Sequence, residues 1–356
     1  MVKRAAGVTP GRRRWRSGAT DEGGRSLVYL KTRRAGCGRS RNSPRRVTDE
    51  SRKRSVMSLR GYVKLARPFT LLAPFFGFAC FALVAAGSPV GGRLALDGAL
   101  IVKILLGAAA AAVLNMASNS VNQIFDREID AINKPERPLV TGEVSRRGAW
   151  IACVVFYLAA IGLSLLVNMR FFYIVLVTSF VTYAYSGPPF RTKRNGFLAN
   201  LTMALPRGGL LVIAGWSAVK PIGYAEPWYI AAVFFLFILG ASTTKDFADM
   251  KGDEAHGCRT LPIIFGVRRA AWIIAPFFVL PFLGLFPGIL LGVLQGNTTP
   301  LLILAGLLSL YGAFIAYLIL RRPEEMATES NHVSWKHMYL LMVLAQVGFA
   351  VSYQLG

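Results

Sequence analysis

Two acidic clusters stand at the ends of apolar stretches in this sequence, and each has the spacing of a helix face. The first cluster consists of Asn122, Asp126 and Asp130, which are four residues apart. The second cluster consists of Asp246, Asp249 and Asp253, which are three and four residues apart. On a helix, either spacing places all three side chains on one face.

Carboxylates at a helix end need a compensating charge. They are disfavoured near the negative pole of the helix dipole, and several of them on one face repel one another. Mg2+ relieves both effects, since it prefers oxygen ligands and is held by a few carboxylates together with substrate phosphates. The clusters therefore predict a site for Mg2+ and a diphosphate. The alternative is a set of solvated acidic loop residues, which does not account for two such clusters with Lys or Arg interleaved in each.

The composition places these clusters in a membrane protein. The chain has 356 residues, of which 54% are hydrophobic, and its mean hydropathy is +0.45. Crossing a bilayer takes about 20 apolar residues. The apolar stretches predict nine spans, at residues 69–86, 98–121, 149–168, 171–186, 197–219, 228–244, 270–294, 301–320 and 337–355. The predicted fold is an all-α, polytopic bundle of about nine transmembrane helices with a central cavity that opens at the cytoplasmic face.

The distribution of Lys and Arg among the loops predicts the orientation. Loops 126–148, 186–195, 245–269 and 321–336 carry five, three, five and three of these residues. The alternate loops 87–97, 169–170, 220–227 and 295–300 carry one, one, one and none. The amino end and the charged loops are therefore predicted to be cytoplasmic, and both acidic clusters lie on that side.

The first 56 residues differ from the rest of the chain. They contain 17 Lys and Arg against 4 Asp and Glu and show no hydrophobic periodicity, a composition typical of disorder. We divide the chain into this basic extension, 1–56, and a membrane domain, 57–356. The extension is interpreted as sequence upstream of a true start at Met57, an organelle transit peptide, a nucleic-acid-binding arm or a tail without function.

The cysteines and histidines do not indicate a second site. The four cysteines have neither metal-site nor disulfide spacing and are expected to be reduced: Cys37, Cys80, Cys153 and Cys258. The three histidines are scattered, and no nucleophile pairs with them.

Three segments resemble those of a known family. The first cluster with its continuation, NQIFDREIDAINKPERPLVTGEVS, resembles the first aspartate motif of the UbiA superfamily of intramembrane prenyltransferases. KDFADMKGDEAHGCRTLPIIFG is similar to the second motif, and YAYSGPPFRTKRNGFLANL resembles the segment between them. The resemblance covers essentially all of residues 57–356 and none of residues 1–56.

The resemblance implies Mg2+-dependent transfer of a prenyl group from a polyprenyl diphosphate to an aromatic or other lipophilic acceptor. Mg2+ and diphosphate would be bound by the two clusters, in which the catalytic carboxylates are Asp126, Asp130, Asp249 and Asp253, with Asn122 and Asp246 as further ligands. Diphosphate oxygens would be contacted by Lys134 and Arg137. The pocket would be lined by Arg67, Tyr183 and Tyr185.

Several polar residues within or beside the spans are further candidates for substrate contacts. Polar side chains at membrane depth usually face a cavity or bond to a neighbouring helix, and both interpretations stay open for Asn119. Lys245 opens the second cluster. Arg207 follows Pro206, which should loosen the helix, and is expected to face the cavity rather than to snorkel.

The chemistry of prenyl transfer suits these residues. Ionisation of an allylic diphosphate leaves charge on the leaving group, which metals and cations stabilise. The carbocation must be kept from water, as a cavity inside a helical bundle does. Aromatic faces stabilise such a cation, and the candidates are Phe125, Tyr183 and Tyr185; the alternative for each is a place in the interfacial aromatic belt.

Three other classes fit less well. A multi-span secondary transporter, the main alternative, tends to bind its substrate at midplane between broken helices, whereas these acids lie at one face. The aspartate signature of phospholipid-synthesising alcohol phosphotransferases is not found. A structural protein gives no account of the acidic clusters.

The acceptor and the location are predicted only coarsely. The wording EIDAINKPERPL is closer to the homogentisate, chlorophyll and geranylgeranylglyceryl-phosphate types within the superfamily than to the 4-hydroxybenzoate type. The protein is therefore expected to act in the biosynthesis of quinones, tocopherol-like compounds or prenyl lipids. Membrane lipid is the expected surrounding, and neither nucleic acid nor an obligate protein partner is indicated. The predicted location is a bacterial inner membrane, or an organelle membrane if residues 1–56 are a transit peptide.

Overall fold

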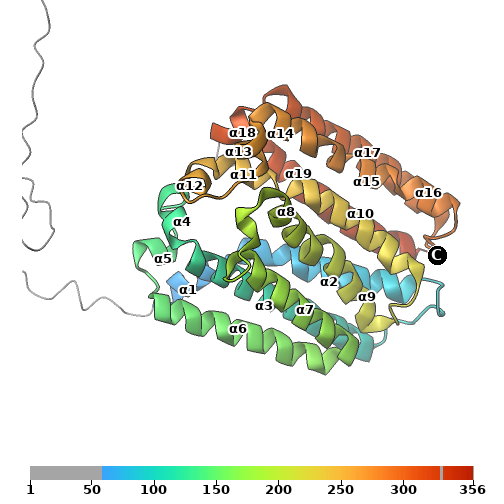
Figure 1. Cartoon of the computed structure of the whole chain (residues 1–356). Coiled ribbons are helices and arrows are strands. Elements are labelled where there is room, and N and C mark those ends of the chain that lie inside the picture. The colour runs from blue at the N-terminus through green and yellow to red at the C-terminus, as the bar shows by residue number, and fades with distance from the viewer. Residues whose placement is uncertain (1–57, 329–331, 356) are drawn as a thin grey trace, which may run out of the picture. The chain divides into compact units, whose positions relative to one another are not determined.

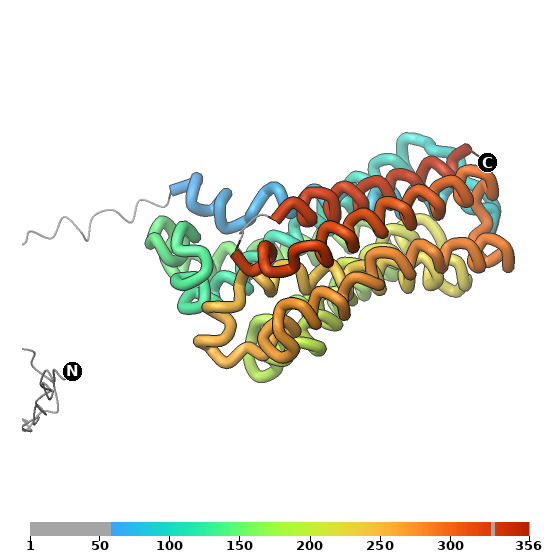
Figure 2. Tube along the Cα trace, turned by 90° about the horizontal axis from the view of Figure 1, so that it is seen from above, coloured from blue at the N-terminus to red at the C-terminus, as the bar shows by residue number. Residues whose placement is uncertain are grey.

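The computed structural model describes residues 58–328 and 332–355, and these form helices joined by turns and loops. Within them, one isolated β-bridge joins Asn195 to Arg259. The long helices run side by side, with the short helices α1, α4, α5 and α12 at one end (Figure 1). The view from above places α1 at that end and the carboxyl terminus at the other (Figure 2). Residues 1–56 lie outside the described part, so the division of the chain stays a prediction.

Within the described residues, eight helical segments are long and apolar enough to cross a membrane. Four are single helices: α3 (Gly98–Phe125), α6 (Arg146–Val167), α7 (Met169–Ser186) and α17 (Thr298–Arg321). Two pair a long helix with a short one: η2 (Pro68–Leu71) with α2 (Leu72–Gly87), and α10 (Ala225–Ala241) with α11 (Thr244–Ala248). Two are interrupted: α8 (Gly196–Ala204), η4 (Leu205–Leu210) and α9 (Leu211–Val219); and α14 (Val267–Ile274), η5 (Ala275–Phe278), α15 (Leu280–Leu283) and α16 (Leu285–Leu290).

Shorter helices connect these segments at the end that carries the acidic clusters. They are α1 (Leu59–Ala66), α4 (Arg127–Asn133), α5 (Pro138–Thr141), η3 (Thr192–Arg194), α12 (Met250–Ala255), α13 (Leu261–Phe265) and α18 (Glu325–Thr328). The ninth predicted span corresponds to α19 (Val333–Gln354), a helix of 22 residues that packs against α2 and α17. It is not among the eight, so the count of nine spans stays a prediction.

Prolines account for the interrupted segments. A proline lacks the backbone N–H that the helix ladder needs, and its ring displaces the preceding turn. Pro206 lies in η4, where the backbone is π-helical, and this confirms the expected loosening beside Arg207. Pro276, Pro281 and Pro287 lie in η5, α15 and α16, which explains why one predicted span is built of four short pieces.

A polar network closes the end of the bundle opposite the acidic clusters. Glu226 is buried and accepts hydrogen bonds from the Ser88 hydroxyl (2.5 Å), the Gln295 backbone N–H (2.6 Å) and the Tyr353 hydroxyl (2.6 Å). Lys220, also buried, donates to the Ser88 carbonyl oxygen (2.6 Å). The network therefore joins α2, α10 and α19 to the loop before α17.

Glu226→Ala is expected to destabilise the protein by about 3 kcal/mol, because it leaves the donors of Ser88, Gln295 and Tyr353 without their carboxylate. Thermal unfolding in detergent measures this loss. Glu324→Ala is the control, since Glu324 pairs with the exposed Arg268 and such exposed pairs contribute little to stability. Equal effects of the two substitutions would contradict the structural role assigned to Glu226.

Candidate active site

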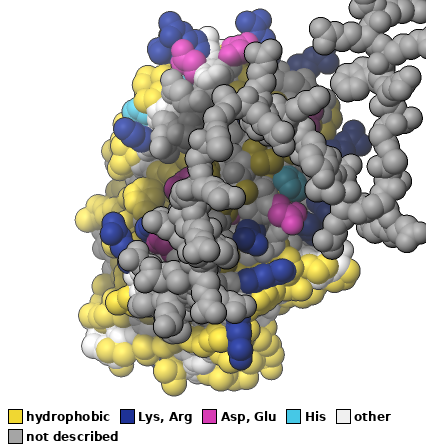
Figure 3. Space-filling view, turned by 90° about the vertical axis from the view of Figure 1, so that its left-hand side faces the viewer, with side chains coloured by type: hydrophobic (Ala, Val, Ile, Leu, Met, Phe, Trp, Pro, Cys, Tyr) yellow, Lys and Arg dark blue, Asp and Glu magenta, His cyan; other side chains and the backbone are white. Residues whose placement is uncertain are grey.

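A cavity of about 760 Å3 lies inside the bundle. Its polar wall holds Asn122, Asp126, Lys134, Arg137, Lys193, Lys245, Asp246, Asp249 and Asp253. Its apolar wall holds Ala111, Leu114, Phe171, Val175, Ala214 and Phe237. From Asp126 to Ala111 the lining of α3 extends over about 22 Å at the helical rise per residue. Figure 3 looks onto the polar end, where charged side chains gather between hydrophobic flanks.

The first acidic cluster is divided by the end of α3. Asn122 lies within α3, Asp126 follows its last residue with φ −101° and ψ 10°, and Asp130 belongs to α4. Asp126 is buried and accepts from Asn122 Nδ2 at 2.7 Å; it also pairs with Lys193 Nζ, and Arg191 Nη2 lies 3.8 Å from its Oδ1. Asn122 and Asp126 therefore meet at the cavity wall, as the spacing predicts.

Asp130 does not reach the cavity wall. It is buried, and its Oδ2 accepts from Arg137 Nη1 at 2.5 Å. Burial raises the pKa of this carboxyl, while the neighbouring Arg137 opposes the rise. In this geometry Asp130 orients Arg137, which does line the cavity.

All three carboxylates of the second cluster line the cavity. Lys134 Nζ lies 2.6 Å from both carboxylate oxygens of Asp249, and Lys245 Nζ lies 3.1 Å from Asp246 Oδ1. Lys245 also donates to the Tyr185 hydroxyl at 3.0 Å. Asp249 and Lys134 are far apart in sequence, so the ion pair joins the two predicted motifs across the cavity.

The aromatic candidates separate into two kinds. Tyr185 lines the cavity, and the Lys245 ammonium lies 5.6 Å from the centre of its ring. Tyr183 and Phe125 are not part of the cavity wall; their rings pack edge to face at 6.1 Å, and the Tyr183 hydroxyl donates to the Pro188 carbonyl oxygen. Trp335 and Tyr339 of α19 line the cavity, and sequence reasoning did not select them.

Three polar candidates within or beside the spans also lie at the cavity. Asn119 lines the cavity, but its Nδ2 donates to the Ala66 carbonyl oxygen and the Thr70 hydroxyl, both at 2.9 Å. Its amide therefore links α3 to α1 and η2. Arg67 and Arg207 line the cavity as well, and in the described part of the chain neither guanidinium forms an ion pair. Arg67 has left-handed backbone geometry, with φ 56°, between α1 and η2. These two arginines give the cavity unneutralised positive charge.

Lys193 is the main site residue that sequence reasoning missed. It is buried, lines the cavity and pairs with Asp126, although it is 67 residues away in sequence. It belongs to η3, next to Arg191, whose Nη2 donates to the Phe125 carbonyl oxygen at 3.2 Å. The signal in the sequence was the group of three cations in a short loop, Arg191, Lys193 and Arg194.

Burial shifts the pKa of groups at the polar end. The pKa of Asp253 is raised to about 7, mainly by burial and further by the neighbouring carboxylates of Asp246 and Asp249. Burial lowers the pKa of Lys134, although Asp249 opposes this. The pKa of Arg67 is lowered to about 10 by burial and by the positive charges of Arg137 and Arg207. The polar end is thus a crowded, partly desolvated set of charges.

The donor set fits Mg2+ only in company with a substrate. Among the described residues, no three Asp, Glu, His or Cys side chains are grouped closely enough to hold a metal by themselves. Carboxylate oxygens of Asp126, Asp246 and Asp249 are instead paired with lysines. This arrangement matches the usual behaviour of Mg2+, which takes one or two carboxylates from the protein and further ligands from substrate phosphates and water.

Comparison with known proteins identifies the class. The model of the UbiA prenyltransferase family matches residues 71–343. The digeranylgeranylglyceryl phosphate synthase of Thermococcus gammatolerans is 31% identical over 289 residues, which cover 81% of this chain and 98% of that protein. The bacteriochlorophyll synthase 34 kDa chain of Chloroflexus aurantiacus is 33% identical over 210 residues, which cover 59% of this chain and 65% of that protein. The chain therefore belongs to the UbiA prenyltransferase family.

Solved structures show the same fold. A UbiA homologue from Archaeoglobus fulgidus bound to GPP and Mg2+ aligns with a TM-score of 0.64 at 21% identity, over 83% of this chain and 100% of that chain. A UbiA homologue from Aeropyrum pernix aligns with a TM-score of 0.64 at 20% identity, over 80% of this chain and 98% of that chain. The protein is thus an integral membrane prenyltransferase, and the resemblance seen in its motifs is confirmed. The transporter interpretation is set aside.

Proposed function

We propose that this protein transfers a prenyl group from a polyprenyl diphosphate to a lipophilic acceptor in a Mg2+-dependent reaction. The observation that carries the proposal is the meeting of Asp126 and Asp249, from separate motifs, at the polar end of one cavity whose remaining wall is apolar. The diphosphate would occupy the polar end and the prenyl chain the apolar interior. The homologue bound to GPP and Mg2+ supports this assignment.

Binding of metal by the carboxylates would free the paired lysines to bind the substrate. Mg2+ would be held by one or two carboxylates at a time, drawn from Asp126, Asp246, Asp249 and Asp253 with Asn122 beside them, together with diphosphate oxygens, and it would neutralise charge on the leaving group. Lys193 and Lys134 now pair with Asp126 and Asp249. When those carboxylates bind metal, the two ammonium groups become available to phosphate oxygens. Asp130 would hold Arg137 in position for the same diphosphate.

The interior of the cavity would protect the allylic cation. Its apolar wall excludes water, which would otherwise capture the cation. The aromatic faces that line the cavity, including Tyr185, Trp335 and Tyr339, would stabilise positive charge on the prenyl carbon. Phe125 and Tyr183 are not in that wall and are not assigned this role.

The acceptor is proposed to carry an anionic group of the phosphate type. Arg67 and Arg207 line the cavity without an ion-pair partner among the described residues, and a planar guanidinium suits phosphate. The relatives named digeranylgeranylglyceryl phosphate synthase favour the same class. The relatives named chlorophyll or bacteriochlorophyll synthase favour a tetrapyrrole acceptor instead, and this is the alternative.

A membrane-fraction assay tests both parts of the proposal. Membranes that contain the protein would receive labelled geranylgeranyl diphosphate, with or without Mg2+, and either geranylgeranylglyceryl phosphate, homogentisate, chlorophyllide or 4-hydroxybenzoate. We expect label in the glycerol-phosphate product, and only when Mg2+ is present. Label in an aromatic product would overturn the acceptor assignment, and a metal-independent product would overturn the Mg2+ assignment.

The raised pKa of Asp253 predicts a pH-dependent requirement for Mg2+. Below about pH 7 this carboxyl is largely protonated, so a metal must displace a proton; above that pH it is ionised. The Mg2+ concentration for half-maximal activity is therefore expected to fall as the pH rises from 6 to 8, by about tenfold at most. In Asp253→Asn this dependence should be weaker than in the wild type. A pH dependence that Asp253→Asn leaves unchanged would contradict the role of this carboxyl.

The orientation and the domain limits are part of the proposal. The loops rich in Lys and Arg lie at the polar end of the cavity, so the positive-inside rule favours an active site on the cytoplasmic side. All described residues that line the cavity lie within residues 57–356, and we propose that these residues carry the activity. Membrane-impermeant amine reagents test the orientation at Lys251, an exposed residue of α12 at the polar end: in sealed vesicles of known sidedness, we expect it to be labelled from the cytoplasmic side, and labelling from the other side would contradict the orientation.

A further inference from the structure

The two acidic motifs are joined by a side chain to which no role has been assigned. Asn133 is the last residue of α4, directly before Lys134. Its Nδ2 donates to the Asp249 carbonyl oxygen at 2.8 Å, and its Oδ1 accepts from the Gly252 backbone N–H at 2.8 Å. One amide thus bonds to the backbone of the second motif through both its donor and its acceptor.

These bonds fall where the second motif changes direction. Asp249 separates α11 from α12, with φ −93° and ψ 0°; its N–H donates to the Lys245 carbonyl oxygen at 3.2 Å and its own carbonyl oxygen accepts from the Asp253 N–H at 3.1 Å, so one backbone bond to each side holds it where the two helices meet. Gly252 is the third residue of α12, and its N–H is one of the donors that a helix start leaves without an intrahelical partner. Asn133 satisfies that donor and at the same time fixes the carbonyl of Asp249.

Gly252 leaves room for the amide. A Cβ at Gly252 would lie 2.6 Å from Asn133 Nδ2 and 2.7 Å from both its Cγ and its Oδ1, closer than real Cβ contacts allow. Gly252 is buried, and its φ is negative, so the close approach of Asn133 rather than the backbone conformation requires glycine here. The two residues form a fitted pair, which we call the Asn133–Gly252 clasp.

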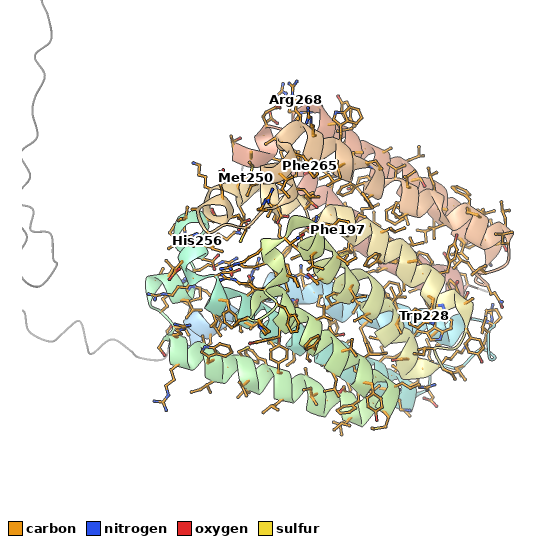
Figure 4. All side chains as sticks on the ribbon, viewed as in Figure 1. Phe197, Trp228, Met250, His256, Phe265 and Arg268 are labelled. Atoms are coloured by element: carbon orange, nitrogen blue, oxygen red, sulfur yellow. The ribbon has the colours of Figure 1, made fainter. Side chains whose placement is uncertain are left out.

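Other contacts between α4 and α12 flank the clasp. Lys134 binds the carboxylate of Asp249 at 2.6 Å, while Asn133 binds its backbone. His256 Nδ1 lies 2.9 Å from the Gly252 carbonyl oxygen, and its Nε2 lies 4.0 Å from Glu128 on α4. Figure 4 shows His256 and Met250 at this end of the bundle and Trp228 at the other. Among these contacts, only the Asn133 amide binds the backbone of the second motif from α4, and it does so with both its nitrogen and its oxygen.

We propose that Asn133 is a positioning residue that holds the two acidic motifs at the separation at which they share one Mg2+–diphosphate. The inference rests on the proposed function. Asp126 lies before α4 and Asp249 lies before α12, so a contact that fixes one short helix on the other also fixes the distance between the two carboxylates. The ion pair of Lys134 with Asp249 cannot do this in the loaded enzyme, because the carboxylate is then needed by the metal.

The test measures ligand-induced stabilisation of the purified full chain in detergent. Unfolding temperature is recorded against Mg2+ concentration in the presence of inorganic pyrophosphate, and activity is recorded in parallel. In Asn133→Ala we expect the half-saturating Mg2+ concentration to rise about tenfold, the effect of losing one or two hydrogen bonds. The KM for the prenyl diphosphate should rise with it, while the KM for the acceptor should not change.

A matched control separates positioning from general destabilisation. Asn168 makes the same two kinds of bond at the opposite end, since its Nδ2 donates to the Ser217 carbonyl oxygen and its Oδ1 accepts from the Phe171 N–H, both at 2.9 Å. Asn168→Ala should lower the unfolding temperature without ligand and leave the half-saturating Mg2+ concentration unchanged. An equal Mg2+ effect in both variants would overturn the proposal.

A double-mutant cycle tests the clasp itself. Gly252→Ala should raise the Mg2+ requirement as much as Asn133→Ala does, because the new methyl group displaces the amide. Asn133→Ala removes the three atoms that lie nearest to the new methyl group, so Asn133→Ala/Gly252→Ala should be no worse than either single variant. Additive effects would overturn the proposal, and Gly252→Ala keeps it testable if Asn133→Ala does not fold.

Asp249→Asn distinguishes failure of the inference from failure of the proposed function. If Asp249→Asn keeps the wild-type response to Mg2+ and pyrophosphate, the proposed site is wrong and the inference falls with it. If Asp249→Asn loses the response while Asn133→Ala keeps it, only the inference is wrong.

Discussion

Asp126→Asn and Asp249→Asn are each expected to lower prenyl transfer by roughly a thousandfold, because a metal that stabilises a leaving group contributes several kcal/mol to the transition state. Both carboxylates line the cavity, each in a different motif. Asparagine keeps the shape of the side chain but removes the charge that balances the cation. The rate is measured at saturating prenyl diphosphate under both saturating and limiting Mg2+, with the amount of folded protein in the membrane as the reference.

Asp97→Asn is the control for these variants. Asp97 caps the other end of α3, where its Oδ1 accepts from the Leu100 N–H at 2.7 Å, and asparagine serves equally well in that position. Its activity should equal that of the wild type. If Asp126→Asn or Asp249→Asn also turned over at the wild-type rate under limiting Mg2+, that residue would not be a ligand.

Lys193→Met is expected to have the next largest effect. Its ammonium pairs with Asp126 and would contact the diphosphate once metal is bound, so the variant should lose roughly ten- to hundredfold in kcat/KM for the prenyl diphosphate. The loss should be largest in KM for that substrate. Methionine fills the same buried space without a charge, which keeps the effect on packing small.

The matched variant is Lys220→Met. Lys220 is also buried, but it lies at the opposite end of the bundle and donates to the Ser88 carbonyl oxygen. This substitution should lower the unfolding temperature and leave the KM for the prenyl diphosphate unchanged. The assignment of Lys193 fails if both variants change that KM equally, or if neither does.

Sequence reasoning succeeded where the physical signal is local. Apolar stretches long enough to cross a bilayer predicted all eight segments that qualify as spans, because length and hydropathy alone define them. Arg207 was expected at the cavity because a charge inside a span is costly and Pro206 loosens the helix beside it, and the structure places it there. The helical spacing of Asn122 and Asp126 was also sufficient to place both at one wall.

Helical spacing was misleading where a helix ends without a proline or glycine in the sequence to mark the end. The turn at Asp126 points Asp130 to Arg137 instead of the cavity, although the four-residue spacing continues. Lys193 was missed because its partner Asp126 is distant in sequence and only the fold, in which η3 packs against α7 and α8, brings them together. Tyr183, selected through the family resemblance, packs against Phe125 outside the cavity wall.

The central claim is that the two acidic motifs bind one metal–diphosphate unit together. The most direct test replaces Mg2+ by Mn2+, which accepts the same oxygen ligands, and measures the hyperfine coupling between bound Mn2+ and the phosphorus nuclei of a non-hydrolysable prenyl diphosphate analogue. We predict a coupling in the wild-type protein that is lost in both Asp126→Asn and Asp249→Asn. A coupling that survives in either variant would contradict the claim, as would Mn2+ binding without any coupling to phosphorus.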